Sequence, residues 1–307
     1  MFWGTPLKNA LSKLLAIGAL LSCGAAQALT CSVTATSIPI STLYTTAANT
    51  NVTGSISVTC TKTGADVNRP YIYIGVDQGE PPAGRNMTRQ NGTQTLAYTM
   101  TRNSATGATW TTGTGQTYTN GTAGGVLYRM NANPATQTQS FNYYFRVAAG
   151  QSTAPAGIYD DLLITVTVRE STNAGAATGT LLQSTTFAAY TSIRDNCYFS
   201  TTPAPLAISY TSFARVASTG STSFQASCTF NTPYTLSLNA VPPPAVTTYN
   251  GTASGLNYSL VLSAGSGTGT SAPQTYGITG TIAAGQSGTC ATGVCNTSQA
   301  QTIYIGF

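Results

Sequence analysis

Cysteine is the residue type in this chain whose number and spacing point most directly to chemistry. Cys31 and Cys60 are 29 positions apart, Cys197 and Cys228 are 31 apart, and Cys290 and Cys295 are 5 apart. Pairing these neighbours is the simplest of the roughly 15 arrangements open to six cysteines in an oxidising compartment. A zinc site would need four Cys or His ligands, and the chain has no His. We expect three disulfides, no metal and no other cofactor.

The acidic residues offer little for catalysis. Without His there is no Ser-His-Asp triad. Two acidic pairs remain, Asp77 with Glu80 and Asp160 with Asp161, which could serve a glycosidase or hold Ca²⁺. The first pair flanks an expected turn, and adjacent residues of a strand point to opposite faces of a sheet. We therefore expect no enzyme.

The first 28 residues have the pattern of a signal peptide. Lys8 and Lys13 precede the apolar run Leu14–Leu21, and the small-residue segment Ala26–Ala28 suits a cleavage site. The apolar run is shorter than the ~20 residues that span a bilayer. An alternative is a lipoprotein signal, in which Cys23 is acylated. Either reading predicts export.

Charged residues are scarce in the rest of the chain. After residue 28 there are ten Lys or Arg and seven Asp or Glu, and Arg215 is the only charged residue from Cys197 to Phe307. A protein that binds nucleic acid by electrostatic attraction clusters Lys and Arg on one face. This composition excludes that class of partner.

Apolar residues alternate with polar ones throughout, which predicts strands. In the first half the alternating segments are Ile56–Cys60, Tyr71–Tyr73, Leu96–Met100, Phe141–Val147 and Leu162–Val168. In the second half they are Phe224–Cys228, Tyr234–Leu238, Leu256–Leu260, Tyr276–Ile278 and Ile303–Phe307. Turn residues separate these short segments, so we predict an all-β fold of two immunoglobulin-like antiparallel β-sandwiches. The predicted domains are residues 29–193 and 194–307.

The two halves are a duplicated module in which the first copy has two enlarged loop regions. Sandwich loops gather at the ends of the sheets and often build recognition surfaces. We expect the apolar residues of these loops to form an adhesive patch. Its candidates are Pro81, Pro82, Met87, Trp110, Tyr118, Val126, Leu127, Tyr128 and Met130. The alternative places Trp110 and Tyr128 on an extra strand pair with their side chains in the core, and Pro81–Pro82 in a rigid turn.

The copies also end differently. Leu162–Val168 is followed by Thr180–Ile193, which is long enough to add one more strand, whereas the matching segment Thr302–Phe307 ends the sequence. A strand without a neighbour exposes unpaired backbone groups. The second sandwich is therefore expected to lack its final strand and to accept one from another chain. Ile303, Ile305 and Phe307 would pair with that strand.

The order of these features resembles the spore coat protein U domain family. The resemblance rests on the signal, the early cysteine, the Leu-x-Tyr strand, Ala-Gly-Gln, and Gly157–Asp161 leading into Leu162–Val168. It covers nearly the whole mature chain as two copies, although the Tyr-Asp-Asp step is absent from the second. The family includes subunits of archaic chaperone–usher pili, in which a donor strand ahead of the first cysteine completes the preceding subunit.

The resemblance implies a role and a set of partners. Only Leu29 and Thr30 precede Cys31 in the mature chain, so the subunit is expected to accept a strand and to give none, as a tip adhesin would. The implied partners are a periplasmic pilus chaperone, an outer-membrane usher, the adjacent pilin and an abiotic or host surface. The expected location is the pilus tip, with a role in biofilm formation. A carbohydrate-binding tip and a structural coat or shaft subunit are the alternatives.

Overall fold

The computed structural model describes residues 29–63, 70–77, 85–102, 104, 107–110, 125–131, 135–171, 179–289 and 297–307. Regular structure in these ranges consists of strands in antiparallel sheets, which confirms the predicted all-β fold. No helix formed by these residues is long and apolar enough to cross a membrane. The predicted signal peptide with Cys23, and the Cys290–Cys295 pair, lie outside the described residues.

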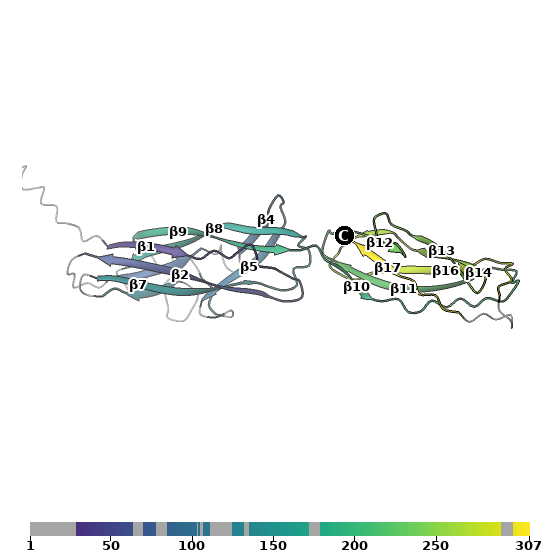
Figure 1. Cartoon of the computed structure of the whole chain (residues 1–307). Helices are drawn as coiled ribbons and strands as arrows, with labels where there is room; N and C mark the ends of the chain where they lie inside the picture. The colour runs from purple at the N-terminus through teal and green to yellow at the C-terminus, as the bar shows by residue number, and fades with distance from the viewer. Residues whose placement is uncertain are drawn as a thin grey trace, which may run out of the picture.

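The strands form two groups along the chain, which Figure 1 shows end to end. The first module contains β1 (Leu29–Ala35), β2 (Thr50–Lys62), β3 (Tyr71–Val76), β4 (Arg85–Arg89), β5 (Thr95–Arg102), β6 (Val126–Arg129), β7 (Ala135–Val147), β8 (Gly157–Ser171) and β9 (Leu181–Ile193). The second module contains β10 (Cys197–Thr201), β11 (Ser218–Cys228), β12 (Pro233–Leu238), β13 (Thr248–Ala253), β14 (Leu256–Leu262), β15 (Ser266–Thr268), β16 (Gln274–Ile282) and β17 (Ile303–Gly306).

Hydrogen bonding in the first module runs in the order β1-β2-β7-β5-β4-β8-β3-β6, with β9 paired to β8. The short strand β4 pairs with β5 through Arg85–Thr88 and with β8 through Thr88 and Arg89. It therefore connects the β1-β2-β7-β5 layer to the layer that contains β8 and β9.

Period-two alternation explains which side chains enter the core. In β7, Tyr143, Phe145 and Val147 are buried, and in β8 Ile164, Val166 and Val168 are buried. Leu162 breaks the predicted pattern because the register of β8 shifts between Asp161 and Ile164, and its side chain is 52% exposed. The sequence-based assignment of Leu162 to the apolar face was wrong, since a local bulge is invisible in the alternation.

The strands of the second module follow the same hydrogen-bonding order as those of the first, but they form two separate sheets. One has the order β10-β11-β16-β14-β13, and the other has β15-β12-β17. Its core is separate from that of the first module, because the buried clusters on the two sides share no residue. The last buried residue of the first core is Ile193, and the second core begins at Cys197.

Disulfides close the first strand pair of each module. Cys31 and Cys60 join β1 to β2, and Cys197 and Cys228 join β10 to β11. These two predicted pairs are confirmed. Loops of this length add on the order of 3–4 kcal/mol of stability in the loop-entropy model.

Candidate strand-binding groove

An apolar groove lies in the second module. Its volume is about 440 Å³, and its lining includes Leu238 of β12, Leu256 and Leu260 of β14, Ile278 of β16 and Ile303 of β17. These residues belong to both sheets, so the groove reaches the interior of the sandwich.

The groove runs beside a strand that has one paired edge. β17 pairs with β12 through Leu236–Ile305 and Ser237–Tyr304. Among the described residues no strand pairs with its other edge. All four residues of β17 are only partly buried, and Phe307 just beyond it is 60% exposed. Unpaired backbone groups beside an apolar groove form a template for another strand.

The first module shows what such a strand does when it is present. Its β8 pairs with β3 on one side and with β9 on the other, across the register from Gly157–Ile193 to Arg169–Leu181. Alternate residues of β9, namely Phe187, Ala189, Thr191 and Ile193, are buried in the module. The prediction that Thr180–Ile193 completes the first module is confirmed.

The segment that follows β1 pairs with the second edge of β9. Ile38 and Leu43 form parallel bridges to Ala189 and Ser192. The amide of Ile38 donates to the carbonyl of Ala188 at 2.9 Å, and the amide of Ser192 donates to that of Thr42 at 2.8 Å. β9 therefore lies between β8 and this segment, and both of its edges are satisfied.

A shared glutamine shows that the two modules are built alike. The side chain of Gln151 receives a hydrogen bond from the amide of Ala97 and donates to the carbonyls of Ala97 and Ala148. Gln286 makes the same three bonds, with Asn257 and Ala283. The sequence Ala-Ala-Gly-Gln-Ser, which occurs once in each module, thus contains a glutamine that holds the same loop in place in both.

The same glutamines position a tyrosine in each module. The backbone amide of Gln151 donates to the Tyr44 hydroxyl at 2.9 Å, and the amide of Gln286 donates to the Tyr210 hydroxyl at 2.8 Å. Tyr210 is one of the residues that line the groove. The correspondence fixes the alignment of the segments that follow β1 and β10.

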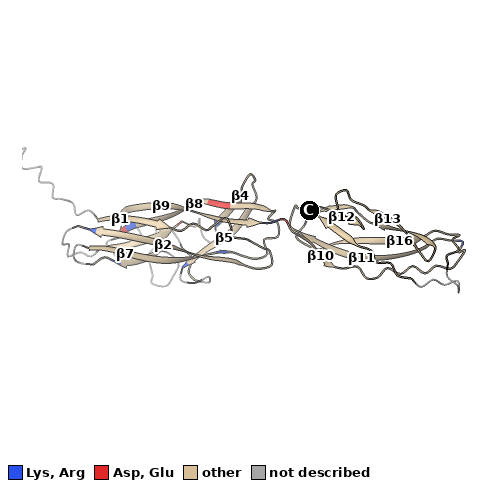
Figure 2. Ribbon diagram, viewed as in Figure 1, with Lys and Arg blue, Asp and Glu red and all other residues tan. Residues whose placement is uncertain are grey.

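The lining of the groove is uncharged. Tyr258 lies against it, and its hydroxyl accepts a hydrogen bond from the Gln301 side chain at 3.0 Å. Burial raises the pKa of Tyr258 above its usual value, so the phenol stays neutral. Figure 2 shows few charged residues over the second module. Such a groove selects an apolar partner and gives no long-range attraction to a charged one.

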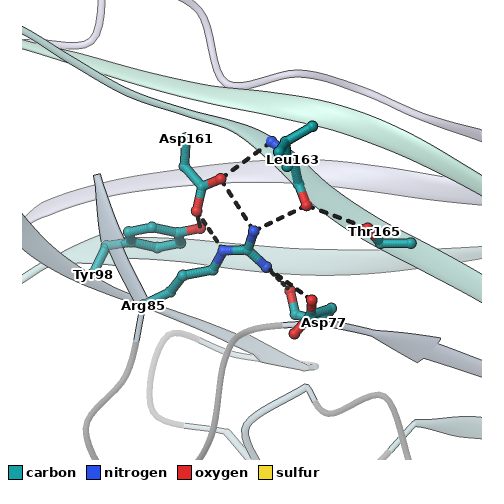
Figure 3. Close-up of polar contacts among 6 residues, drawn as sticks. All are labelled: Asp77, Arg85, Tyr98, Asp161, Leu163 and Thr165. Carbon is teal, nitrogen blue, oxygen red and sulfur yellow. Dashed lines mark hydrogen bonds and ion pairs between the residues drawn. The ribbon is translucent and has the colours of Figure 1, made fainter. Parts of the chain in front are cut away.

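Charged side chains gather instead in the first module, in the contact drawn in Figure 3. The Arg85 guanidinium donates to both oxygens of Asp161, in one case at 3.2 Å, and to the carbonyls of Asp77 and Leu163 at 2.8 and 2.9 Å. The Tyr98 hydroxyl donates to Asp161 at 2.8 Å. This network holds the bulge of β8 in place and uses the hydrogen-bonding capacity that a catalytic acid would need.

The adjacent carboxylates of Asp160 and Asp161 do not converge on one site. Asp160 accepts a hydrogen bond from the Gln90 side chain, while Asp161 faces Arg85, so the two carboxylates point to different partners. Glu80 lies outside the described residues. No group of three or more His, Cys, Asp or Glu side chains is close enough in the described ranges to hold a metal ion.

Several predicted adhesive residues are in the core instead. Met87, Trp110 and Met130 are fully buried in the first module, so their assignment to an exposed patch was wrong. Trp110 follows a bridge between Thr101 and Thr109 that turns its ring inward, and its amide donates to the carbonyl of Met100. The Ala, Thr and Gly around it indicate a loop but carry no signal of this tertiary contact.

The other predicted adhesive residues are half-buried or outside the described structure. Val126, Leu127 and Tyr128 lie in β6, which pairs with β3, and all three are partly buried. Pro81, Pro82 and Tyr118 lie outside the described residues. The described structure therefore brings none of these residues into an exposed apolar patch.

Sequence reasoning missed one part of the groove, the segment from Pro203 to Tyr210. Leu206 and Ile208 of this segment line the groove, although no strand pattern marks them. The available signal is the spacing to the preceding cysteine, because Tyr44 and Tyr210 both stand 13 positions after theirs.

Residues 17–168 match the family model of the Spore Coat Protein U domain. The chain carries a Spore Coat Protein U domain. The matched range ends inside β8, so β9 lies beyond it. The second module lies outside this match and is related to the first by the glutamine and disulfide correspondences described above.

Two solved complexes have similar chains. One is the CsuC–CsuE chaperone–tip adhesion subunit pre-assembly complex from archaic chaperone–usher Csu pili of Acinetobacter baumannii, at 17% identity and a TM-score of 0.42, covering 91% of this chain and 100% of that chain. The other is a chaperone–tip adhesin complex of CFA/I fimbriae, at 9% identity and a TM-score of 0.24, covering 80% and 85%. No curated protein sequence matches the chain.

Proposed function

We propose that this protein is the tip adhesin subunit of a chaperone–usher pilus, with no enzymatic activity. The first module is the adhesin domain (29–193), and the second is the pilin domain (194–307) that joins it to the fibre. The observation that carries this proposal is a difference between the modules at equivalent strands, β8 and β17. In the first module β9 pairs with the free edge of β8, whereas in the second a groove lies beside β17.

The groove accepts a donor strand from the adjacent pilin subunit. The pairing of β9 in the first module predicts how this donor strand binds. It would run antiparallel to β17 on one side and parallel to the 203–210 segment on the other. Ile303 and Ile305 would bond the incoming backbone. Before assembly, a strand of the periplasmic chaperone occupies the same groove, and an outer-membrane usher exports the subunit to the cell surface.

The position of β9 supports placement at the tip. It directly precedes the second module, where a pilin carries its donor strand, and it is used within the same chain to complete the first module. The first module is thus joined to the second as one pilus subunit is joined to the next. Its role at the fibre end is attachment to an abiotic or host surface, and with it biofilm formation.

Strand acceptance is tested with the chain from Leu29 to Phe307, alone and with a peptide that copies Leu181–Ile193. The peptide is expected to protect the second module from proteolysis, because it satisfies the free edge of β17 and covers the groove. A scrambled peptide of the same composition is the control. Equal protease resistance of the second module with and without every strand donor, chaperone included, would contradict the proposal.

The position of the subunit in the fibre is tested by counting and locating antibody labels on isolated fibres. Labelled antibodies against the first module should mark one end of each isolated fibre, and cells that lack this subunit should attach less to surfaces. Labels distributed along the fibre would show a shaft or coat subunit instead. Attachment to plastic that free glycans abolish would indicate a carbohydrate-binding tip.

A further inference from the structure

The second module holds one of its own segments against the groove. This is the 203–210 segment (Pro203–Tyr210), which corresponds without gaps to residues 37–44 of the first module. The alignment is fixed at both ends, because Cys31 and Cys197 form the equivalent disulfides and Tyr44 and Tyr210 bond the equivalent glutamines. Ile38 therefore matches Ala204, and Ile40 matches Leu206.

The carbonyl that should receive the incoming strand is already bonded. In the first module the amide of Tyr190 in β9 donates to the carbonyl of Ile38. In the second module the hydroxyl of Thr222 donates to the matching carbonyl of Ala204 at 2.9 Å. Thr222 stands six positions before Cys228, where the first module has Gly54 six positions before Cys60. The carbonyl that matches the acceptor used by β9 thus already accepts a hydrogen bond from a side chain that the first module lacks.

A pair of glycines forms the seat for this segment. Gly220 pairs with Gly280 across β11 and β16, where the first module has Val52 paired with Phe145. A Cβ on Gly220 would lie 2.2 Å from the carbonyl oxygen of Ala207, and one on Gly280 would lie 2.7 Å from Cδ1 of Ile208. A side chain at position 220 would therefore displace the backbone of the segment, and one at position 280 would push aside the side chains that pack on it.

The two modules also differ in which side chains of this segment are buried. Leu206 is half-buried and packs near Gly280, whereas the matching Ile40 is 52% exposed beside β9. Tyr210 and Tyr44, in contrast, are both buried and fastened in the same way. The two modules thus agree at the tyrosine and differ ahead of it.

We propose that the 203–210 segment is a built-in plug. Seated on Gly220 and Gly280, it covers part of the groove until a strand arrives. It then swings out about Tyr210, releases the Thr222 hydroxyl, and pairs with the strand as residues 38–43 pair with β9. The inference rests on the proposed function, because the strand that displaces the plug is the one the groove accepts.

The plug is tested by thiol labelling of Leu206→Cys in the full chain from Leu29. Adding Gly220→Ala is expected to speed labelling on the order of tenfold, because the new Cβ collides with the backbone of Ala207 and shifts the local opening equilibrium. Gly277→Ala is the matched control on β16, since its Cβ would meet nothing closer than 3.8 Å. Equal labelling rates in the two variants would overturn the plug.

A second variant tests the same contact in case Gly220→Ala disturbs folding. Thr222→Val removes the hydroxyl that holds Ala204 and keeps the side-chain shape, so it should speed labelling severalfold with the sheet intact. No change in labelling with Thr222→Val and with Gly220→Ala alike would show that the segment is not held at this seat.

Measuring strand binding together with labelling distinguishes failure of the plug proposal from failure of the proposed function. Binding of the peptide that copies Leu181–Ile193, followed by native mass spectrometry, should itself speed labelling at Leu206→Cys. Binding without faster labelling would overturn the plug and leave strand acceptance standing. Faster labelling in Gly220→Ala with no binding of the peptide or of a chaperone strand would support the plug and contradict the proposed function.

Discussion

At the scale of single residues, two adjacent aspartates of β8 have opposite environments. The Asp161 side chain is 10% exposed and bonds Arg85, which is 16% exposed. Asp160 bonds the exposed side chain of Gln90. Because hydrogen bonds to buried charged groups are worth more than exposed ones, the neighbours should differ sharply in their effect on stability.

We expect Asp161→Asn to lower the free energy of unfolding of the first module by about 2–3 kcal/mol, because the Arg85 charge loses its buried partner. Asp160→Asn is the matched control and should change it by less than about 0.5 kcal/mol. Urea unfolding followed by tyrosine fluorescence measures both. Similar losses in the two variants would refute the structural role of the Arg85–Asp161 pair.

Tyr159 makes stability depend on alkaline pH. Its buried hydroxyl donates to the carbonyl of Pro155 at 2.7 Å, and burial raises its pKa to about 12. In the unfolded chain the value is about 10. The contribution is therefore complete below pH ~10 and is lost as the pH rises toward the folded value.

We expect the first module to lose stability between about pH 10 and 12, with Tyr159 accounting for up to about 1.4 kcal/mol per pH unit. Tyr159→Phe should make this decline shallower, although it also removes the bond to Pro155. The measurement is urea unfolding at a series of pH values, with tyrosinate absorbance as the titration signal. An unchanged slope in the variant would exclude Tyr159 as a contributor.

At the scale of the elements, β9 shows how one strand completes a core. Phe187 is 5% exposed and lies 5.3 Å from the ring of Tyr143, whereas its neighbour Thr186 faces outward. Ala189 and Ile193 continue the buried face. The contribution of the strand thus depends on every second residue.

Phe187→Ala is expected to lower the stability of the first module by about 3–5 kcal/mol through the cavity it leaves. Thr186→Ala, on the outer face of the same strand, should cost less than about 1 kcal/mol. Limited proteolysis should then cleave the first module of Phe187→Ala and spare the second. Cleavage of both modules at the same rate would argue against separate cores.

Strand alternation allowed most of these elements to be predicted. β9 was predicted instead from its place in the sequence, because Thr180–Ile193 is long enough to add a strand after Leu162–Val168. The bulge at Leu162, the inward turn of Trp110 and the seat of Leu206 could not be predicted in the same way. Each depends on contacts between distant segments: Arg85 with Asp161, Trp110 with Met100, and Leu206 with Gly280. Composition near a residue does not record such contacts.

At the scale of the whole molecule, the two modules have separate cores that are joined by residues 194–196. This joint is fastened to the second module, since the Thr229 hydroxyl donates to the carbonyl of Arg194 at 3.0 Å and the Thr232 hydroxyl bonds Asp195 at 2.5 Å. The division of work that we propose, between attachment and assembly, requires modules that fold and unfold independently.

The disulfides provide the sharpest test of that independence, because each belongs to one module. Replacing Cys197 and Cys228 by Ser should remove about 2–5 kcal/mol from the second module and leave the unfolding temperature of the first unchanged. Replacing Cys31 and Cys60 by Ser should do the reverse. Differential scanning calorimetry should show two transitions, one of which moves in each variant. A single transition that shifts with either pair would mean that the modules unfold as one unit, and the first module could not then stay folded independently of the second.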